Sequence, residues 1–166
     1  MSMPESIYMI GQISAGVKET YLWRERVRKF FEGDKRITLI DPCTNAFNRS
    51  ILKNATTNYT GKVYKIKGTD LLVPKDFSYV KRSTMGMANM IHYDPSKPIL
   101  GTAFELAWYY AMQKTVVGIF DGDIKKDVHC NHPFIRSAIK VWVKDEIEAC
   151  KIIKQFYLDP SDSDPF

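Results

Sequence analysis

The sequence predicts a three-layer α/β domain in which helices cover both faces of a mainly parallel sheet of about five strands. Short apolar segments alternate with amphipathic segments along the chain, as strands and helices do in such a fold. Most of the apolar segments are apolar throughout, which is typical of strands buried on both faces. The 166 residues are 45% hydrophobic and 26% charged, an ordinary globular composition. We therefore expect one domain over residues 1–158 and a mobile tail over residues 159–166.

The first half of the chain contains two of the expected strands. The segment Ser6–Ile10 reads as a buried strand followed by a flexible loop, Gly11–Gly16. An amphipathic helix is predicted over Glu19–Glu32, closed by a glycine. The short apolar run Ile37–Ile40 reads as the second strand, which an Asp-Pro pair ends.

A polar segment rich in Asn, Thr and Lys follows the second strand, from Thr44 to about Asp70. Within it, Val63–Lys67 alternates between apolar and polar residues like an exposed hairpin strand. Segments of this length inside a compact domain usually have a function. We interpret this one as an insertion or lid over a site.

The second half alternates helix and strand again. We predict a helix over Phe77–Met87, a strand over Ala88–Tyr93, a long helix from Gly101 to Gln113, and a buried strand over Thr115–Phe120. A short fifth strand over Ala138–Trp142 and a helix over Lys144–Tyr157 complete the fold, which we expect to be flavodoxin- or Rossmann-like.

The long helix carries the most informative pattern in the chain. Thr102 is placed to cap it, and Glu105 then falls in its first turn, where the helix dipole favours an ionised carboxylate. Glu105 has two interpretations: a solvated first-turn acid, or a nucleophilic or charge-stabilising group at a strand-to-helix turn. The residues that form the apolar stripe of this helix are Phe104, Ala107, Trp108 and Ala111.

The position of the expected site favours the second interpretation. Ligands of open α/β sheets bind beyond the carboxyl ends of the strands. The loops after Ile10, Ile40, Tyr93 and Phe120 should meet there, together with the start of the long helix. Asp41 and Asp94, which follow two of these strands, are therefore candidate substrate-binding residues.

Composition argues against several other classes of function. The net charge is +5, but the basic residues are split among four short segments, so a nucleic-acid partner is not expected. The segment His129–His132 lacks a second pair of metal ligands, so no metal is expected. Cys43 has no base marked out beside it and reads as a packed thiol. No secretory signal or membrane span is visible, which predicts a cytoplasmic protein without membrane partners.

Two motifs resemble the nucleoside 2-deoxyribosyltransferase superfamily, which includes the 2'-deoxynucleoside 5'-phosphate N-hydrolases. They are Tyr8–Ile13 at the first strand end and Gly101–Leu106 before the long helix. The segment Arg136–Trp142 also looks like the hydrolase branch. The resemblance covers the chain in order, apart from the insertion.

The resemblance implies cleavage of an N-glycosidic bond without a cofactor. Glu105 matches the nucleophile that forms a glycosyl-enzyme intermediate, and Tyr8 matches a tyrosine that orients it. The loop that closes over the sugar and base corresponds to Gly11, Gln12 and Ile13, and Ser14 follows it directly. Further substrate contacts are expected from Gly101, Thr102 and Ser137.

Two residues depart from the family pattern. The family has an aspartate in an Ala/Ser-Asp pair at the third strand, which helps to protonate the departing base, whereas this chain has Asn89. Asparagine can hydrogen-bond a base but is not a general acid; the nearby Asp94 is one possible substitute. Ile99 stands where the family often has a polar residue that contacts the sugar 5' end or its phosphate.

The sequence thus predicts an enzyme that acts on deoxynucleosides or deoxynucleotides, with Glu105, Tyr8 and Asn89 as catalytic residues. The aromatic run Trp108–Tyr110 provides more aromatic surface than the single apolar stripe that packs in the core can bury. This favours a homo-oligomer. The alternative is a nucleotide-binding protein on the same scaffold whose catalysis is weakened at Asn89 and Ile99.

Overall fold

The computed structural model describes residues 4–14, 16–44 and 68–158, and it confirms the predicted fold class. Five parallel strands form one sheet in the order β2-β1-β3-β4-β5. The strands are β1 (Glu5–Gly11), β2 (Ile37–Ile40), β3 (Met85–Asn89), β4 (Val116–Ile119) and β5 (Val141–Val143). After β1 the chain forms the edge strand β2, and it then returns past β1 to form β3, β4 and β5 on the other side of β1. Such a reversal leaves a crevice between the carboxyl ends of β1 and β3.

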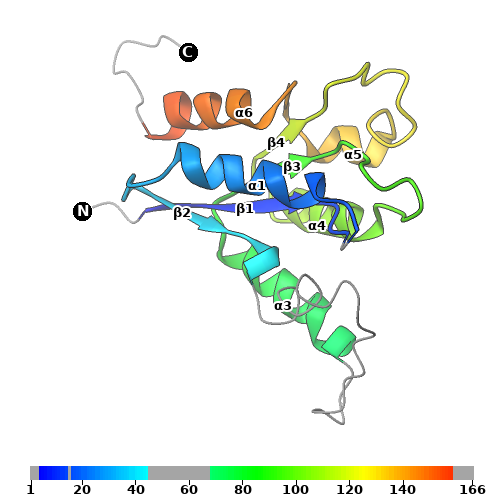
Figure 1. Cartoon of the computed structure of the whole chain (residues 1–166), viewed down its shortest axis with the longest axis horizontal. Helices are drawn as coiled ribbons and strands as arrows, with labels where there is room; N and C mark the ends of the chain where they lie inside the picture. Colours follow the sequence, from blue (N-terminus) through cyan, green and yellow to red (C-terminus); the bar gives the residue numbers. More distant parts are fainter. Residues whose placement is uncertain (1–3, 15, 45–67, 159–166) are drawn as a thin grey trace.

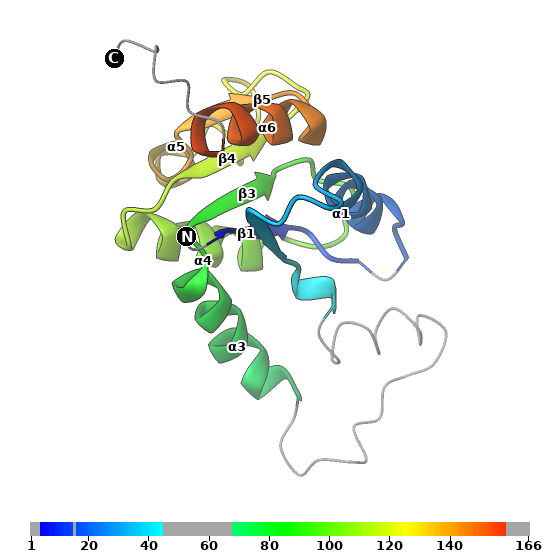
Figure 2. The same cartoon turned by 90° about the vertical axis from the view of Figure 1, so that its left-hand side faces the viewer.

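Helices cover both faces of this sheet (Figure 1 and Figure 2). On one face lie α1 (Glu19–Phe30) and α6 (Glu146–Ile153), which a π-helical turn over Lys154–Leu158 extends. On the other lie α3 (Gly68–Arg82), α4 (Leu100–Ala111) and α5 (Pro133–Ala138). A short 3-10 turn, η1 (Pro42–Thr44), follows β2.

The central strand β1 shows how the sequence divides the core into two layers. Ile7 and Met9 pack toward α1 and α6, whereas Tyr8 and Ile10 face α3 and α4. All four side chains are fully buried. Successive strand residues point to opposite faces, so an uninterrupted apolar run supplies both layers.

The region before β4 differs from the prediction. The helix expected over Phe77–Met87 spans Gly68–Arg82, and β3 begins at Met85, inside the expected helix. The residues Ile91 to Tyr93, expected in the third strand, lie beyond it. The segment Met85–Asn89 has few β-branched residues, but all five are buried in the centre of the sheet, where packing outweighs local propensity.

The carboxyl-terminal part shows a smaller shift. The strand expected over Ala138–Trp142 is present as β5, but it begins later, at Val141, and ends at Val143. Ala138 is instead the last residue of a short helix, α5. Pro133 stands at the first helical position of α5, where its fixed φ suits a helix. The expected lid with its hairpin strand and the expected tail lie almost entirely outside the described residues, except that Gly68–Asp70 belong to α3. No helix in the described part of the chain is long and apolar enough to cross a membrane.

Candidate active site

Tyr8 and Glu105 form the centre of the site. Tyr8 reaches from β1 toward α4, and its hydroxyl donates a 2.5 Å hydrogen bond to Oε1 of Glu105. Tyr8 is fully buried and Glu105 is 8% exposed. The structure therefore brings together the two residues that the sequence paired, at the face of the sheet covered by α3 and α4.

Glu105 differs from the expected first-turn acid. Helix α4 begins at Leu100, so Glu105 lies in its second turn, and the helix carries no acid in its first turn. Thr102 is inside the helix and does not cap it; the N-cap is Ile99, which has no capping side chain. Glu105 therefore lies beyond the free N–H groups of the helix start, and its surroundings decide its charge.

Those surroundings favour a neutral carboxyl group. The pKa of Glu105 is raised to about 8, chiefly by loss of water. That value already includes a lowering by the hydrogen bond from Tyr8, a raising by the charge of Asp76 and a lowering by the charge of Arg24. Burial, together with the nearby Glu105 carboxylate, also raises the pKa of Tyr8, which keeps its proton. Tyr8 is thus a permanent donor, and Glu105 can change its charge near neutral pH.

Asp76 on α3 is a third ionisable group here, and it was not among the site residues predicted from the sequence. Its Oδ1 atom is buried and has no hydrogen-bond partner among the described residues. Burial raises the pKa of Asp76 to about 6, against a lowering by Lys75. The charge of Asp76 acts on both Tyr8 and Glu105. Asp76 as a whole is half-buried. A carboxyl group with one enclosed, unpartnered oxygen and a pKa near neutrality can exchange protons with a ligand.

The loop after β1 is tied to the loop before α4 by a set of side-chain bonds, which we call the loop clasp. The Gln12 amide donates to the Asp94 and Lys97 carbonyls at 2.9 and 3.2 Å, and its oxygen accepts from the Asp94 N–H at 2.8 Å. Ser14 donates to an Asp94 carboxylate oxygen at 2.5 Å. Hydrogen bonds from Ser14 and Ser96 lower the pKa of Asp94, which argues against Asp94 as a substitute acid.

Gly11 is required where the clasp leaves β1. Its φ is +155°, and a Cβ atom there would lie 3.1 Å from the Asn89 carbonyl and 3.2 Å from the Trp23 ring. Any side chain would push the loop away from β3. Ile13, which lies between Gln12 and Ser14 in the chain, is half-buried.

Asn89 ends β3 at the same edge, but its side chain faces away from Glu105. It follows Met85 and Met87, which pack toward α1 and α6. Its amide donates to the Tyr93 hydroxyl at 3.3 Å, and its oxygen accepts from the Ile91 N–H at 3.0 Å. Only 2% of Asn89 is exposed. The structure thus does not bring Asn89 to the Tyr8–Glu105 pair.

The remaining predicted residues have structural partners. Asp41 accepts from the Cys43 N–H at 2.8 Å and pairs with Arg24 and Arg28. Gly101 is exposed on α4, and Thr102 is buried. Ser137 on α5 donates to the Pro133 carbonyl at 2.8 Å and is exposed. It lines a groove on the side of α4 that faces away from Glu105.

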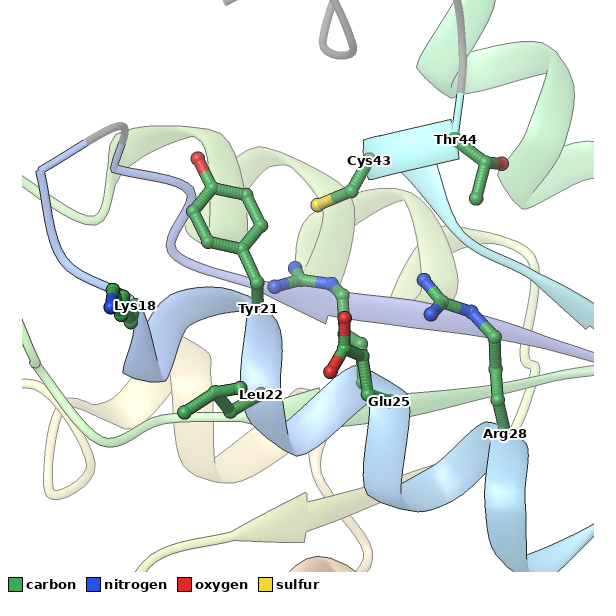
Figure 3. A pocket seen from close by; sticks show the side chains of 8 residues that line it. Lys18, Tyr21, Leu22, Glu25, Arg28, Cys43 and Thr44 are labelled. Carbon is green, nitrogen blue, oxygen red and sulfur yellow. The ribbon is translucent and has the colours of Figure 1, made fainter. Parts of the chain in front are cut away.

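Two hollows flank the site. One of about 400 Å³ lies between α1 and η1, where the Cys43 sulfur points toward the Tyr21 side chain (Figure 3). Burial raises the pKa of the Cys43 thiol to about 12, so it is no nucleophile. The other, of about 810 Å³, is the α4–α5 groove. Among the described residues, no three His, Cys, Asp or Glu side chains cluster as metal ligands do.

Comparison of the structure with solved structures identifies the fold. No protein-family model matches the sequence, and no curated protein matches it. A 2-deoxyribosyltransferase from Bacillus psychrosaccharolyticus superposes with a TM-score of 0.57 over 87% of this chain and 89% of its own, at 14% identity. The chain shares the fold of this 2-deoxyribosyltransferase.

Two further structures share this deoxyribosyltransferase fold. A conserved protein from Enterococcus faecalis matches with a TM-score of 0.59 and 19% identity, over 92% of this chain and 99% of its own. A CMP N-glycosidase from Clostridium botulinum matches with a TM-score of 0.50 and 12% identity, over 90% and 98%. These likenesses concern the fold, and the chemistry must be argued from the side chains.

Proposed function

We propose that this protein cleaves the N-glycosidic bond of 2'-deoxynucleosides or their 5'-phosphates and transfers the deoxyribosyl group to another base or to water. The observation that carries the proposal is the buried Glu105 carboxyl group, held by Tyr8 beside Asp76 at the ligand-binding edge of the sheet. The structural likeness to 2-deoxyribosyltransferases and a CMP N-glycosidase supports it.

In the first step, Glu105 attacks the anomeric carbon of the sugar. Its Oε1 is occupied by Tyr8, so Oε2 is the attacking atom. As the Oε2–C1' bond forms, the bond from C1' to the base nitrogen breaks and its electron pair stays on the base. Asp76 gives its proton to that base. The products of this step are a free base, a glycosyl ester on Glu105 and an ionised Asp76.

The second step reverses these roles. An incoming base or water attacks C1', the ester bond breaks, and its electron pair returns to Glu105. Asp76 takes the proton that the incoming group loses and is ready for the next cycle. Tyr8 donates to Glu105 throughout, which fixes the carboxyl group in place and stabilises the carboxylate when it leaves.

The protonation states of Glu105 and Asp76 restrict the pH at which this reaction runs. Their pKa values of about 8 and about 6 belong to neighbouring carboxyl groups that interact, so they describe the pair. Between these values the pair holds one proton. Most of the pair holds that proton on Glu105, which has the higher pKa. The reactive form is the minor one, with the proton on Asp76 and Glu105 ionised; it is most populated near pH 7, where activity should peak.

We also propose that two copies of the chain associate through the α4–α5 groove. The predicted apolar stripe of α4 does not face the core: Phe104, Ala107 and Ala111 are exposed and Trp108 is half-buried. Phe104 and Tyr110 are 61% and 58% exposed, and Phe134 on α5 is 81% exposed. These three rings alone leave roughly 400 Å² open, about half of what one partner buries in a stable interface of roughly 800 Å².

The catalytic proposal is tested by incubating the protein with deoxynucleosides and deoxynucleoside 5'-phosphates and separating any free base by chromatography. Glu105→Gln should fold, because a neutral amide avoids the cost of burying a charge, and should release no base. Glu32→Gln, at an exposed glutamate, is the matched control and should match wild type. Base release by Glu105→Gln at the wild-type rate would refute the proposal. Ligand binding without base release by wild type would instead support a nucleotide-binding protein.

A further inference from the structure

Arg24 on α1 is a charged side chain that is completely buried. Its guanidinium donates to the Gly11 carbonyl at 2.9 Å, to the Gln12 carbonyl at 3.4 Å, and to Thr20 of its own helix. The guanidinium carbon also lies 4.5 Å from the centre of the Trp23 ring. An arginine near the middle of a surface helix normally extends into water, so this arrangement needs a reason.

The contacts of Arg24 join the start of the loop clasp to the end of β2. Gly11 and Gln12 are the residues where the chain leaves β1. On the other side, the Arg24 Nε lies 3.5 Å from Oδ1 of Asp41, the first residue after β2. One planar guanidinium group thus spans two neighbouring strand ends. The fixed geometry of its five donors suits this bridging role, which a lysine with one ammonium group does not reproduce.

The local charges do not cancel around Arg24. Asp41 pairs with both Arg24 and Arg28, so two arginines share one carboxylate. The Arg28 side chain is 40% exposed and is screened by water, whereas Arg24 is fully enclosed. Lys18 and Glu25, on the rim of the adjacent hollow (Figure 3), are exposed, and their charges oppose one another. Arg24, Arg28 and Asp41 therefore carry a net positive charge beneath the loop clasp, because one carboxylate offsets only one of the two guanidinium groups.

We propose that Arg24 is a positioning residue for the reaction at Glu105: its guanidinium fixes the turn after β1 against the end of β2 and so holds the loop clasp in place. This inference rests on the proposed function, in which Glu105 attacks the sugar. It adds a residue from the opposite face of the sheet to a site otherwise built on the α3–α4 face.

The groups around Glu105 leave Arg24 as a distinctive contributor. Tyr8 faces Glu105 from β1, Asp76 acts on it from α3, and Tyr109 lies one turn along α4. Two of these are phenols and one is an acid. Arg24 is the cation that acts on Glu105: its charge lowers the pKa of Glu105, by less than the Tyr8 hydrogen bond does and against the larger effect of burial. Charges act over longer distances in a protein interior than in water, so the guanidinium affects Glu105 without touching it.

Two substitutions separate the two roles. Arg24→Gln removes the charge but keeps an amide that can donate to a loop carbonyl. Arg24→Lys keeps the charge but loses the planar set of donors. Arg28→Gln is the matched control, because Arg28 also pairs with Asp41 but does not act on Glu105. If Arg24→Gln does not fold, the double variant Arg24→Gln, Asp41→Asn also removes the buried Asp41 carboxylate that has lost this partner. The double variant then tests the effect of the Arg24 charge.

The primary readout is the titration of Glu105, followed by NMR of ¹³C-labelled glutamate carboxyl groups and assigned with Glu105→Gln. In Arg24→Gln the Glu105 pKa should rise, and each unit of increase should lower the turnover at pH 7 by about tenfold. In Arg24→Lys the pKa should stay near that of wild type while KM increases, because the loop is less firmly held. Arg28→Gln should change neither quantity.

An unchanged Glu105 titration in folded Arg24→Gln, or an equal shift in Arg28→Gln, would overturn the electrostatic role. A wild-type KM in Arg24→Lys would overturn the role in fixing the loop. The NMR measurement does not depend on turnover, so it separates this inference from the proposed function. If wild type releases no base, the proposed function fails, while the titration still decides whether Arg24 controls the charge of Glu105.

Discussion

Replacing Asp76 with asparagine is the substitution that tests the proton transfers most sharply. In wild type the reactive form holds one proton on the Asp76–Glu105 pair. The dependence of kcat/KM on pH should therefore be bell-shaped, with limbs near the pKa values of about 6 and about 8 and a maximum near pH 7. The amide that replaces the carboxyl group cannot titrate, so Asp76→Asn should lose the alkaline limb.

The remaining limb reports Glu105 alone. The charge of Asp76 raises the pKa of Glu105, so its removal should move that pKa below about 8, and the rate should reach a plateau above it. The plateau itself should be low: loss of a general acid typically costs about 10² to 10⁴ in rate. A substrate whose leaving group needs no proton, such as 4-nitrophenyl 2-deoxyribofuranoside, should lose far less.

The assay is initial-rate measurement from pH 5 to pH 9 on wild type, Asp76→Asn and the control Asp121→Asn, which changes an exposed carboxyl group in a turn. The natural deoxynucleoside and the nitrophenyl substrate are compared on each protein. A pH dependence of kcat/KM in Asp76→Asn that stays bell-shaped as in wild type would refute the assignment of Asp76 as the proton donor. An equal loss of rate on both substrates would also refute it.

Two further predictions follow from the same contacts. Tyr8→Phe removes the 2.5 Å hydrogen bond that lowers the Glu105 pKa, so that pKa should rise and the free energy of unfolding should fall by about 1–3 kcal/mol. A pH–rate profile measures the first effect and urea unfolding measures the second. A variant unchanged in both would contradict the described pairing of Tyr8 with Glu105. Light scattering should find wild type dimeric or larger and Phe104→Glu monomeric. The control Phe156→Glu changes a ring that is 53% exposed but lies outside the α4–α5 groove, so it should associate like wild type. A monomeric wild type at tens of micromolar would rule out the interface.

The fold was predictable because apolar runs and amphipathic helices alternate along the chain. β1 and β4 are apolar over nearly their whole length, and burial on both faces requires that. The residues Met85–Met87 were assigned to a helix because their local propensity does not favour a strand, while their place between β1 and β4 puts them in β3. Propensity is local, and the neighbours that override it are not visible in the sequence.

The candidate site was predictable in part, for a related reason. Tyr8 and Glu105 lie in motifs, and the rule for strand ends places both at one edge. Asp76 was missed because the helix was expected to begin at Phe77, which left Asp76 in a loop. In α3 it precedes the buried Val80 by one turn, and a carboxylate on an inward-facing stripe is the signal that could have revealed it.

Arg24 was not singled out, because the sequence does not show which of several arginines on one helix is enclosed. The outward stripe of α4 illustrates the same difficulty. Its apolar residues follow the spacing of a core face, yet Leu106 and Tyr109 occupy the core beside the buried Glu105. A helix with two apolar faces gives no indication, from periodicity alone, of which one packs on the sheet.

The covalent intermediate on Glu105 is the central claim, and it can be trapped. A 2-deoxy-2-fluoro nucleoside with a good leaving group slows hydrolysis of a glycosyl ester, because the fluorine destabilises the positive charge that develops on the sugar. Wild type is incubated with this compound, denatured and digested, and the peptides are analysed by mass spectrometry. The account predicts the added mass of the fluorosugar on the peptide that contains Glu105, and none in Glu105→Gln. The same mass on another residue, or base release by wild type with no labelled peptide, would contradict it.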